Sequence, residues 1–113
     1  MFTYNEKIRE KKDFDKLFVN GKKSTSNLFI IYVCPNNLEF NRLAISIKRH
    51  IAKAVDRNRM KRLVREIFRL NKHTIFGANK NDILVIVRTD FSNHNYDFIN
   101  EELLKQWQKF SQS

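Results

Sequence analysis

The chain has 113 residues, a length typical of one domain, and its 22 Lys and Arg against 12 Asp and Glu give a net charge of +10. Its 42% hydrophobic content includes ten Phe, which excludes a disordered basic tail, because such tails are poor in aromatic residues. No apolar run approaches the ~20 residues that span a bilayer, no secretory signal is visible, and a single cysteine, Cys34, excludes an intramolecular disulfide framework. We expect one domain over residues 1–113, located in the cytoplasm and without a membrane partner.

Helices are predicted where apolar residues recur at intervals of three and four, and strands where β-branched and aromatic residues cluster. In chain order these are a helix at residues 11–19, strands at 28–34 and 42–47, a helix at 51–70, a strand at 82–88 and a helix at 96–110. Asn20-Gly21 is a fitting stop for the first helix, and residues 22–27 are a candidate short edge strand. A loop at 71–81 and a turn at 89–95 complete the chain.

This order, α-β-β-(β)-α-β-α, predicts an α+β fold in which helices pack on a small mixed sheet as an α/β sandwich. The strand at 42–47, the helix at 51–70 and the strand at 82–88 form a β-α-β unit. A parallel pairing of its strands would need the long crossover that this helix provides. In the first of these strands Leu43, Ile45 and Ile47 alternate with small or polar residues, so one face is expected to pack against a helix.

The central helix carries the densest positive charge of the chain. Six Lys and Arg fall among the thirteen residues from Arg57 to Arg69, and Glu66 is the only acid among them. At about 100° per residue, one side of the helix gathers Met60, Leu63, Val64 and Ile67. The opposite side gathers Asn58, Lys61, Arg62, Arg65 and Arg69. Because acidic partners are nearly absent, a merely solvated helix with side-chain ion pairs is disfavoured, and the pattern indicates nucleic-acid binding.

Three further cations, Lys48, Arg49 and Lys53, flank the expected start of this helix. Backbone N–H groups at a helix N-terminus favour anions, so phosphate binding is preferred over an ordinary exposed turn. The scattered His50, His73 and His94 have no zinc-ligand spacing. Paired catalytic carboxylates and glycine-rich phosphate loops are also missing from a sequence with two Gly, so we expect no autonomous active site.

Phe14 and Phe18 lie four residues apart on the first predicted helix. From spacing alone such a pair is expected in the core. Exposed in a groove, however, aromatic rings stack on single-stranded bases, and both interpretations stay open at this point.

The segment from Ser46 to Arg69, S-I-K-R-H-I-A-K-A-V-D-R-N-R-M-K-R-L-V-R-E-I-F-R, resembles the signature of the bacterial ribonuclease P protein component. The flanks agree, with D-F-x-x-x-F on a helix that ends at Gly21 and the strand D-I-L-V-I-V-R after the loop. The resemblance covers nearly the full chain. Ala52 stands where the family tends to have Gly, and because Ala is the better helix former, an earlier helix start is expected.

The resemblance implies the small protein subunit of a ribonucleoprotein endonuclease that removes the 5′ leader from precursor tRNA. Its catalytic site is in the RNA, which binds Mg²⁺, so no catalytic or metal-binding residue is expected in the protein. The implied partners are ribonuclease P RNA and precursor tRNA, and not DNA. The implied fold is a sandwich with a left-handed β-α-β crossover, against the usual right-handed preference.

The resemblance also implies roles for named residues. The expected contacts to RNA are Lys48, Arg49, Lys53, Arg57, Asn58, Arg59, Lys61, Arg62, Arg65 and Arg69. Phe14 and Phe18 are expected to line a cleft for the single-stranded leader, with Tyr32 and Arg88 as additions to it. Two other classes would share the basic helix: a structural ribosomal or general RNA-binding protein, and a DNA-binding regulator that lays the helix in the major groove.

Overall fold

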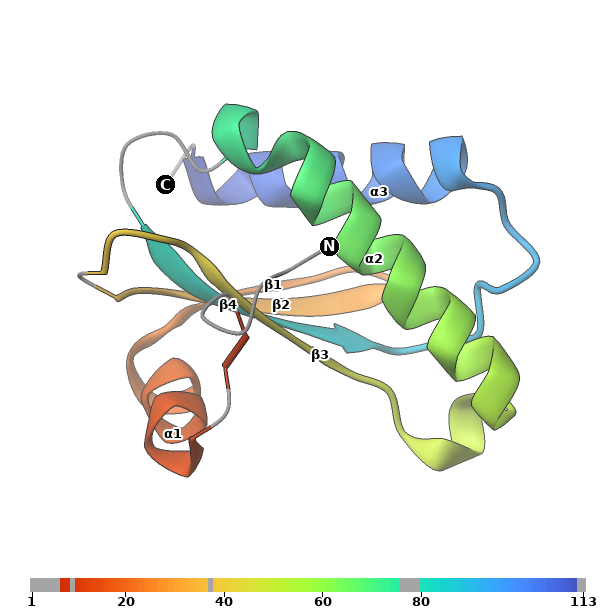
Figure 1. Cartoon of the computed structure of the whole chain (residues 1–113), viewed down its shortest axis with the longest axis horizontal. Coiled ribbons are helices and arrows are strands. Elements are labelled where there is room, and N and C mark those ends of the chain that lie inside the picture. Colours follow the sequence, from red (N-terminus) through yellow and green to blue (C-terminus); the bar gives the residue numbers. More distant parts are fainter. Residues whose placement is uncertain (1–6, 9, 37, 76–79, 112–113) are drawn as a thin grey trace.

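The computed structural model describes residues 7–8, 10–36, 38–75 and 80–111. Within these residues the chain forms three α-helices, four strands and a short 3₁₀ turn, Arg49–Ile51 (Figure 1). Their bounds are α1 Lys11–Asn20, β1 Lys22–Thr25, β2 Phe29–Pro35, β3 Arg42–Ser46, α2 Ala54–Ile75, β4 Asn81–Val87 and α3 Tyr96–Ser111. The predicted α+β class and element order are confirmed, and the candidate edge strand is β1.

The four strands form one mixed sheet in the order β1-β2-β4-β3. β2 pairs antiparallel with both β1 and β4, whereas β3 pairs parallel with β4. In Figure 1 the chain follows β3, the strand nearest the viewer, from left to right and returns along α2 above the sheet. It then follows β4, farther from the viewer, from left to right again. This path makes the β3–α2–β4 crossover left-handed, as the resemblance implies.

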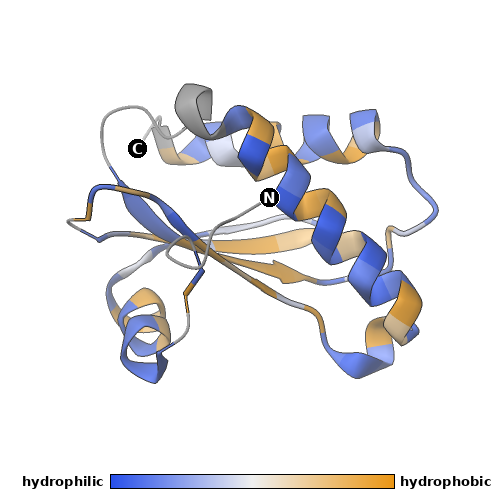
Figure 2. Ribbon diagram, viewed as in Figure 1, coloured by the Kyte–Doolittle hydropathy of each residue, from blue (hydrophilic) through white to orange (hydrophobic). Residues whose placement is uncertain are grey.

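One face of the sheet carries the larger hydrophobic core. Alternate residues of β2 and β4 point to this face, among them Ile31 and Val85, and both are fully buried. α2 and α3 cover it, with Val64 and Ile99 among their buried side chains. Figure 2 shows hydrophobic and hydrophilic segments alternating along α2, above mostly hydrophobic central strands. The predicted apolar side of the central helix is therefore the side that packs on the sheet.

The opposite face of the sheet is covered only in part. α1 and the segment at Ile8 pack there over Cys34 and Leu84, and Leu17 of α1 is fully buried in this smaller cluster. Cys34 is buried and carries a free thiol. Because α1 has ten residues and lies toward one end of the strands (Figure 1), the described elements leave the remaining part of this face partly exposed.

The central helix differs from its prediction at both ends. α2 begins at Ala54, after a 3₁₀ turn and an extended Ala52 with φ −162° and ψ 167°. The expected earlier start is therefore wrong, and any residue can adopt this backbone, so Ala in place of Gly brings no strain. α2 also continues through part of the expected loop to Ile75. Asn71 explains this, since its Nδ2 donates to the Ile67 carbonyl at 2.7 Å and to Asn100 Oδ1 at 3.2 Å, which ties the added turn to α3. Gly77 lies outside the described residues.

None of the described helices is both long enough and apolar enough to cross a membrane. α2 has 22 residues, yet its exposed side is lined by charged residues over most of its length. The length of this helix therefore serves its packing across the sheet and the display of a charged surface.

Candidate nucleic-acid interface

α2 separates its apolar and cationic side chains as its sequence predicts. Met60, Val64 and Ile67 are buried against the sheet and Leu63 is half-buried. The polar side is exposed at Asn58, Arg59, Arg62, Arg65 and Arg69, and half-buried at Arg57 and Lys61. Lys48, Arg49 and Lys53, which precede the helix, are exposed as well. We call these ten side chains the basic surface, and all of them reach solvent at least in part.

The basic surface is poor in acidic partners. Among the described side chains, Arg69 is its one member in an ion pair, with Nε donating to Glu66 Oε2 at 3.0 Å. The hydrogen bond from Arg69 holds the pKa of Glu66 below its ordinary value. The other cations of the surface make no ion pair with a described carboxylate. Their mutual repulsion is thus uncompensated within this part of the chain, which favours a polyanionic ligand.

A second candidate surface lies on the uncovered part of the opposite sheet face. Phe18 is 51% exposed, and its ring meets the edge of the half-buried Tyr32 ring with 5.0 Å between centroids. The Lys23 ammonium lies 5.7 Å from the centroid of Tyr32. Beside them Ile30 and Ile86 are cross-strand partners on β2 and β4 and are both half-buried. We call these five residues the open sheet face. They combine aromatic, apolar and cationic groups as single-strand binding surfaces do.

The expected leader-binding residues are only partly brought together. Phe18 and Tyr32 are in contact, and Arg88 is exposed just past β4, where its Nη1 donates to the Ser26 carbonyl at 2.7 Å. Phe14, in contrast, is half-buried and lines a separate hollow of about 210 Å³ at the β3 edge, shared with Arg65 of α2. The two phenylalanines of α1 therefore face different surroundings.

Sequence reasoning missed Lys23, Ile30 and Ile86 as parts of this surface. Their membership follows from strand register, because Lys23 pairs with Tyr32 and Ile30 pairs with Ile86 across neighbouring strands. That β2 is an apolar strand was visible in the sequence. Which of its two faces α1 would leave uncovered was not.

A largely buried ion cluster fixes α1 relative to the sheet. Arg42 of β3 donates from Nε to Asp82 Oδ1 at 2.7 Å and from Nη2 to Asp82 Oδ2 at 2.6 Å. Its Nη1 donates to Asp13 of α1 at 3.3 Å. The hydrogen bonds to Asp82 raise the pKa of Arg42, against the opposing effect of burial. Asp82, expected only to begin a strand, therefore helps to hold the helix that carries Phe14 and Phe18.

Comparison with known proteins adds to this geometry. A family model described as Ribonuclease P matches residues 2–111. The ribonuclease P protein component of Syntrophus aciditrophicus is 39% identical over 99 residues, which cover 88% of this chain and 82% of the relative. That of Thermotoga maritima is 42% identical over 91 residues, which cover 80% of this chain and 76% of the relative.

Two solved structures share the fold. The RNase P protein from Thermotoga maritima aligns with a TM-score of 0.79 and 34% identity, covering 92% of this chain and 96% of that one. The RNase P protein of Staphylococcus aureus, solved at 2.0 Å, aligns with a TM-score of 0.80 and 29% identity, covering 91% and 93%. Sequence and fold thus agree over nearly the same span.

Proposed function

The chain belongs to the ribonuclease P protein family, as a protein component of that endoribonuclease, and on this premise we propose that it binds two RNAs at two surfaces. The basic surface binds the catalytic RNA of the holoenzyme, and the open sheet face with Arg88 binds the 5′ leader of precursor tRNA. The observation that carries the proposal is the basic surface itself, where every cation except Arg69 lacks an ion pair with a described carboxylate and most of the cations lie on a helix that the core holds in place.

Binding at the basic surface would act through charge. Lys and Arg side chains that neutralise phosphates release condensed counterions, so the affinity falls as salt rises. The α2 scaffold fixes the spacing of these cations because Met60, Val64 and Ile67 anchor the opposite side of the helix. A fixed array of guanidinium groups suits the bidentate recognition of phosphate oxygens.

The open sheet face would hold the leader as an extended single strand. Phe18 and Tyr32 offer ring surfaces for stacking, and Lys23 and Arg88 offer charge for the backbone. Ring faces accept every base, so little sequence preference is expected. Mature tRNA lacks a leader and gains nothing from this surface, so the protein would strengthen the binding of precursor over product.

Bond cleavage is assigned to the RNA. Mg²⁺ belongs, in this proposal, to the RNA of the holoenzyme, and the protein supports it indirectly by organising phosphates nearby. The side chains of the two surfaces bind and orient RNA, and none of them is the nucleophile or the base. The site of action proposed is the cytoplasm, where precursor tRNA is made and processed.

Reconstitution tests the proposal. The chain is added to a bacterial ribonuclease P RNA at low Mg²⁺, and leader release from a precursor tRNA is followed over time. We expect stimulation that saturates near one protein per RNA and weakens as salt rises. The pure chain without RNA serves as the control and should cleave nothing. Absence of stimulation at every protein ratio would refute the assignment.

A further inference from the structure

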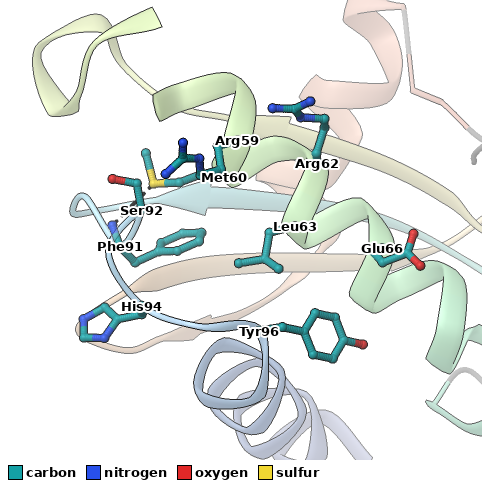
Figure 3. Close-up of a pocket in the computed structure, with 9 residues that line it drawn as sticks. All are labelled: Arg59, Met60, Arg62, Leu63, Glu66, Phe91, Ser92, His94 and Tyr96. Carbon is teal, nitrogen blue, oxygen red and sulfur yellow. Dashed lines mark hydrogen bonds between the residues drawn. The ribbon is translucent and has the colours of Figure 1, made fainter. Parts of the chain in front are cut away.

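A hollow of about 420 Å³ lies between α2 and the segment that joins β4 to α3, on the side of the sheet that α2 and α3 cover. Its lining combines apolar, aromatic, cationic and hydrogen-bonding side chains. They are Arg59, Met60, Arg62, Leu63, Glu66, Phe91, Ser92, His94 and Tyr96 (Figure 3). The volume falls within the range of small-ligand sites.

The floor of the hollow is apolar, and its side chains are held in place. Figure 3 shows the Phe91 ring and the Leu63 side chain pointing toward one another between loop and helix. Phe91 is fully buried, and its backbone N–H lies 3.4 Å from the Met60 sulfur, which fixes the loop to α2. The next residue, Ser92, donates its backbone N–H to Asp90 Oδ1 at 2.9 Å. The hollow is therefore preformed, and a ligand would spend little binding energy on ordering it.

The two sides of the hollow differ in charge. On the helix side Arg59 and Arg62 are exposed and form no ion pair with a described carboxylate, because Glu66 is engaged by Arg69. On the loop side the His94 ring stacks on Phe98, with 4.6 Å between centroids and 27° between planes, and both residues are exposed. Cations without partners on one side and an exposed aromatic stack on the other suit an anionic ligand with a planar ring.

We propose that this hollow binds one unpaired nucleotide of ribonuclease P RNA. The nucleobase would lie over Leu63 and beside the His94–Phe98 stack, and the phosphates of the nucleotide would contact Arg59 and Arg62. The nucleotide must be unpaired, since a base within a duplex has both faces stacked and cannot turn out to enter a hollow between a helix and a loop. This inference rests on the proposed function. It adds to the basic surface a pocket that binds single-stranded RNA, on the side of the sheet opposite the open sheet face.

The test fills the hollow without changing charge. Ser92→Trp places an indole in it, whereas Asn93→Trp places the same group on the neighbouring exposed residue, which does not line it. Both variants are titrated against a bacterial ribonuclease P RNA at fixed salt, and nucleotide flexibility is mapped by 2′-hydroxyl acylation. Because the hollow would lose one stacked base, we expect roughly tenfold weaker binding for Ser92→Trp. One unpaired nucleotide should lose its protection while the rest of the footprint persists. Asn93→Trp should behave as wild type.

His94→Ala provides a second variant, since this side chain is exposed and its removal leaves the core intact. It should weaken binding in the same direction and unprotect the same nucleotide. Equal affinities and footprints for Ser92→Trp, His94→Ala and wild type would overturn the inference, as would equal weakening by Ser92→Trp and Asn93→Trp. Failure of the wild-type chain to bind the RNA would instead refute the proposed function, so the two failures are distinguishable.

Discussion

At the scale of single residues, exposure separates the two phenylalanines of α1. Phe18 is half-exposed against Tyr32, whereas Phe14 packs within the smaller hydrophobic cluster. A half-exposed ring contributes little to the stability of the fold. The exposed part of the Phe18 ring is therefore available for a ligand. Phe14 contributes to the stability of the fold as well, so its replacement would change both the free energy of unfolding and any binding of the leader.

Phe18→Ala is therefore predicted to lower the free energy of unfolding by no more than about 1 kcal/mol, the order of the edge contact with Tyr32 that it removes. In the reconstituted holoenzyme it should weaken precursor tRNA binding at least about fivefold, the low end of the effect of one base–aromatic stack. Mature tRNA binding should not change. Denaturant unfolding measures the change in stability, and the dissociation constants for precursor and mature tRNA measure the change in binding. Val19→Ala is the control, because Val19 is 79% exposed and adjacent. Equal weakening for precursor and mature tRNA would contradict the leader assignment.

Asp82 is a second case at this scale, because its one carboxylate joins β4 to β3 and to the segment that follows β2. It is buried, and it accepts hydrogen bonds from Arg42 and from Asn36 Nδ2, the latter at 2.9 Å. Removing its charge would leave Arg42, whose side chain is 18% exposed, with the 3.3 Å contact to Asp13 as its one ion pair to a described carboxylate.

Asp82→Asn is predicted to lower the free energy of unfolding by about 3–5 kcal/mol, the usual effect of breaking a buried pair. Asp15→Asn removes the same charge from the exposed pair with Lys11, 3.6 Å apart, and should cost at most about 1 kcal/mol. Urea unfolding of both variants measures the difference. A similar change for the two would show that the buried cluster does not stabilise the fold.

At the scale of elements, the junction of α1 and β1 depends on a close backbone approach. Gly21 ends the helix, as predicted, and its N–H donates to the Leu17 carbonyl at 3.0 Å. Its backbone is extended, with φ −75° and ψ 153°, so the residue is not required for a left-handed turn. A Cβ there would collide with the Leu17 carbonyl oxygen and lie 3.2 Å from that of Val33. These neighbours are all backbone atoms, so no flexible side chain could move aside to make room for the Cβ.

Gly21→Ala is accordingly predicted to destabilise the protein by about 1–3 kcal/mol through overpacking. Because α1 must shift, leader selectivity in the holoenzyme should decline as well. Asn20→Ala, at the neighbouring exposed position, should have a small effect on both quantities. Thermal unfolding and precursor binding test this, and an unchanged Gly21→Ala variant would show that the junction tolerates a side chain.

The same scale shows what the sequence could predict. Periodicity located the three helices and β3, continuous apolar runs located β2 and β4, and the charge pattern of α2 located its exposed side. The end of α2 was missed because Asn71 joins α3 through a tertiary hydrogen bond that no local pattern encodes. The role of Asp82 and the hollow beside Phe91 were missed for the same reason, since both depend on residues far apart in the chain.

At the scale of the whole molecule, the sheet separates two kinds of surface. α2 and α3 cover one face, and α2 carries the basic surface, while the other face is left partly open beside α1. A protein arranged in this way can contact a structured RNA and an extended strand at once. Such a protein is therefore required to discriminate between RNAs by their leader, beyond any general attraction to phosphate.

Leader length tests that requirement most directly. Dissociation constants are measured for precursor tRNAs with leaders from zero to about ten nucleotides, with the holoenzyme and with its RNA alone, at fixed salt and Ca²⁺ to prevent cleavage. We predict that affinity for the holoenzyme rises over the first several nucleotides and then levels off, while affinity for the RNA alone changes little. If the protein strengthened binding equally at every leader length, including zero, the open sheet face would not be a leader site.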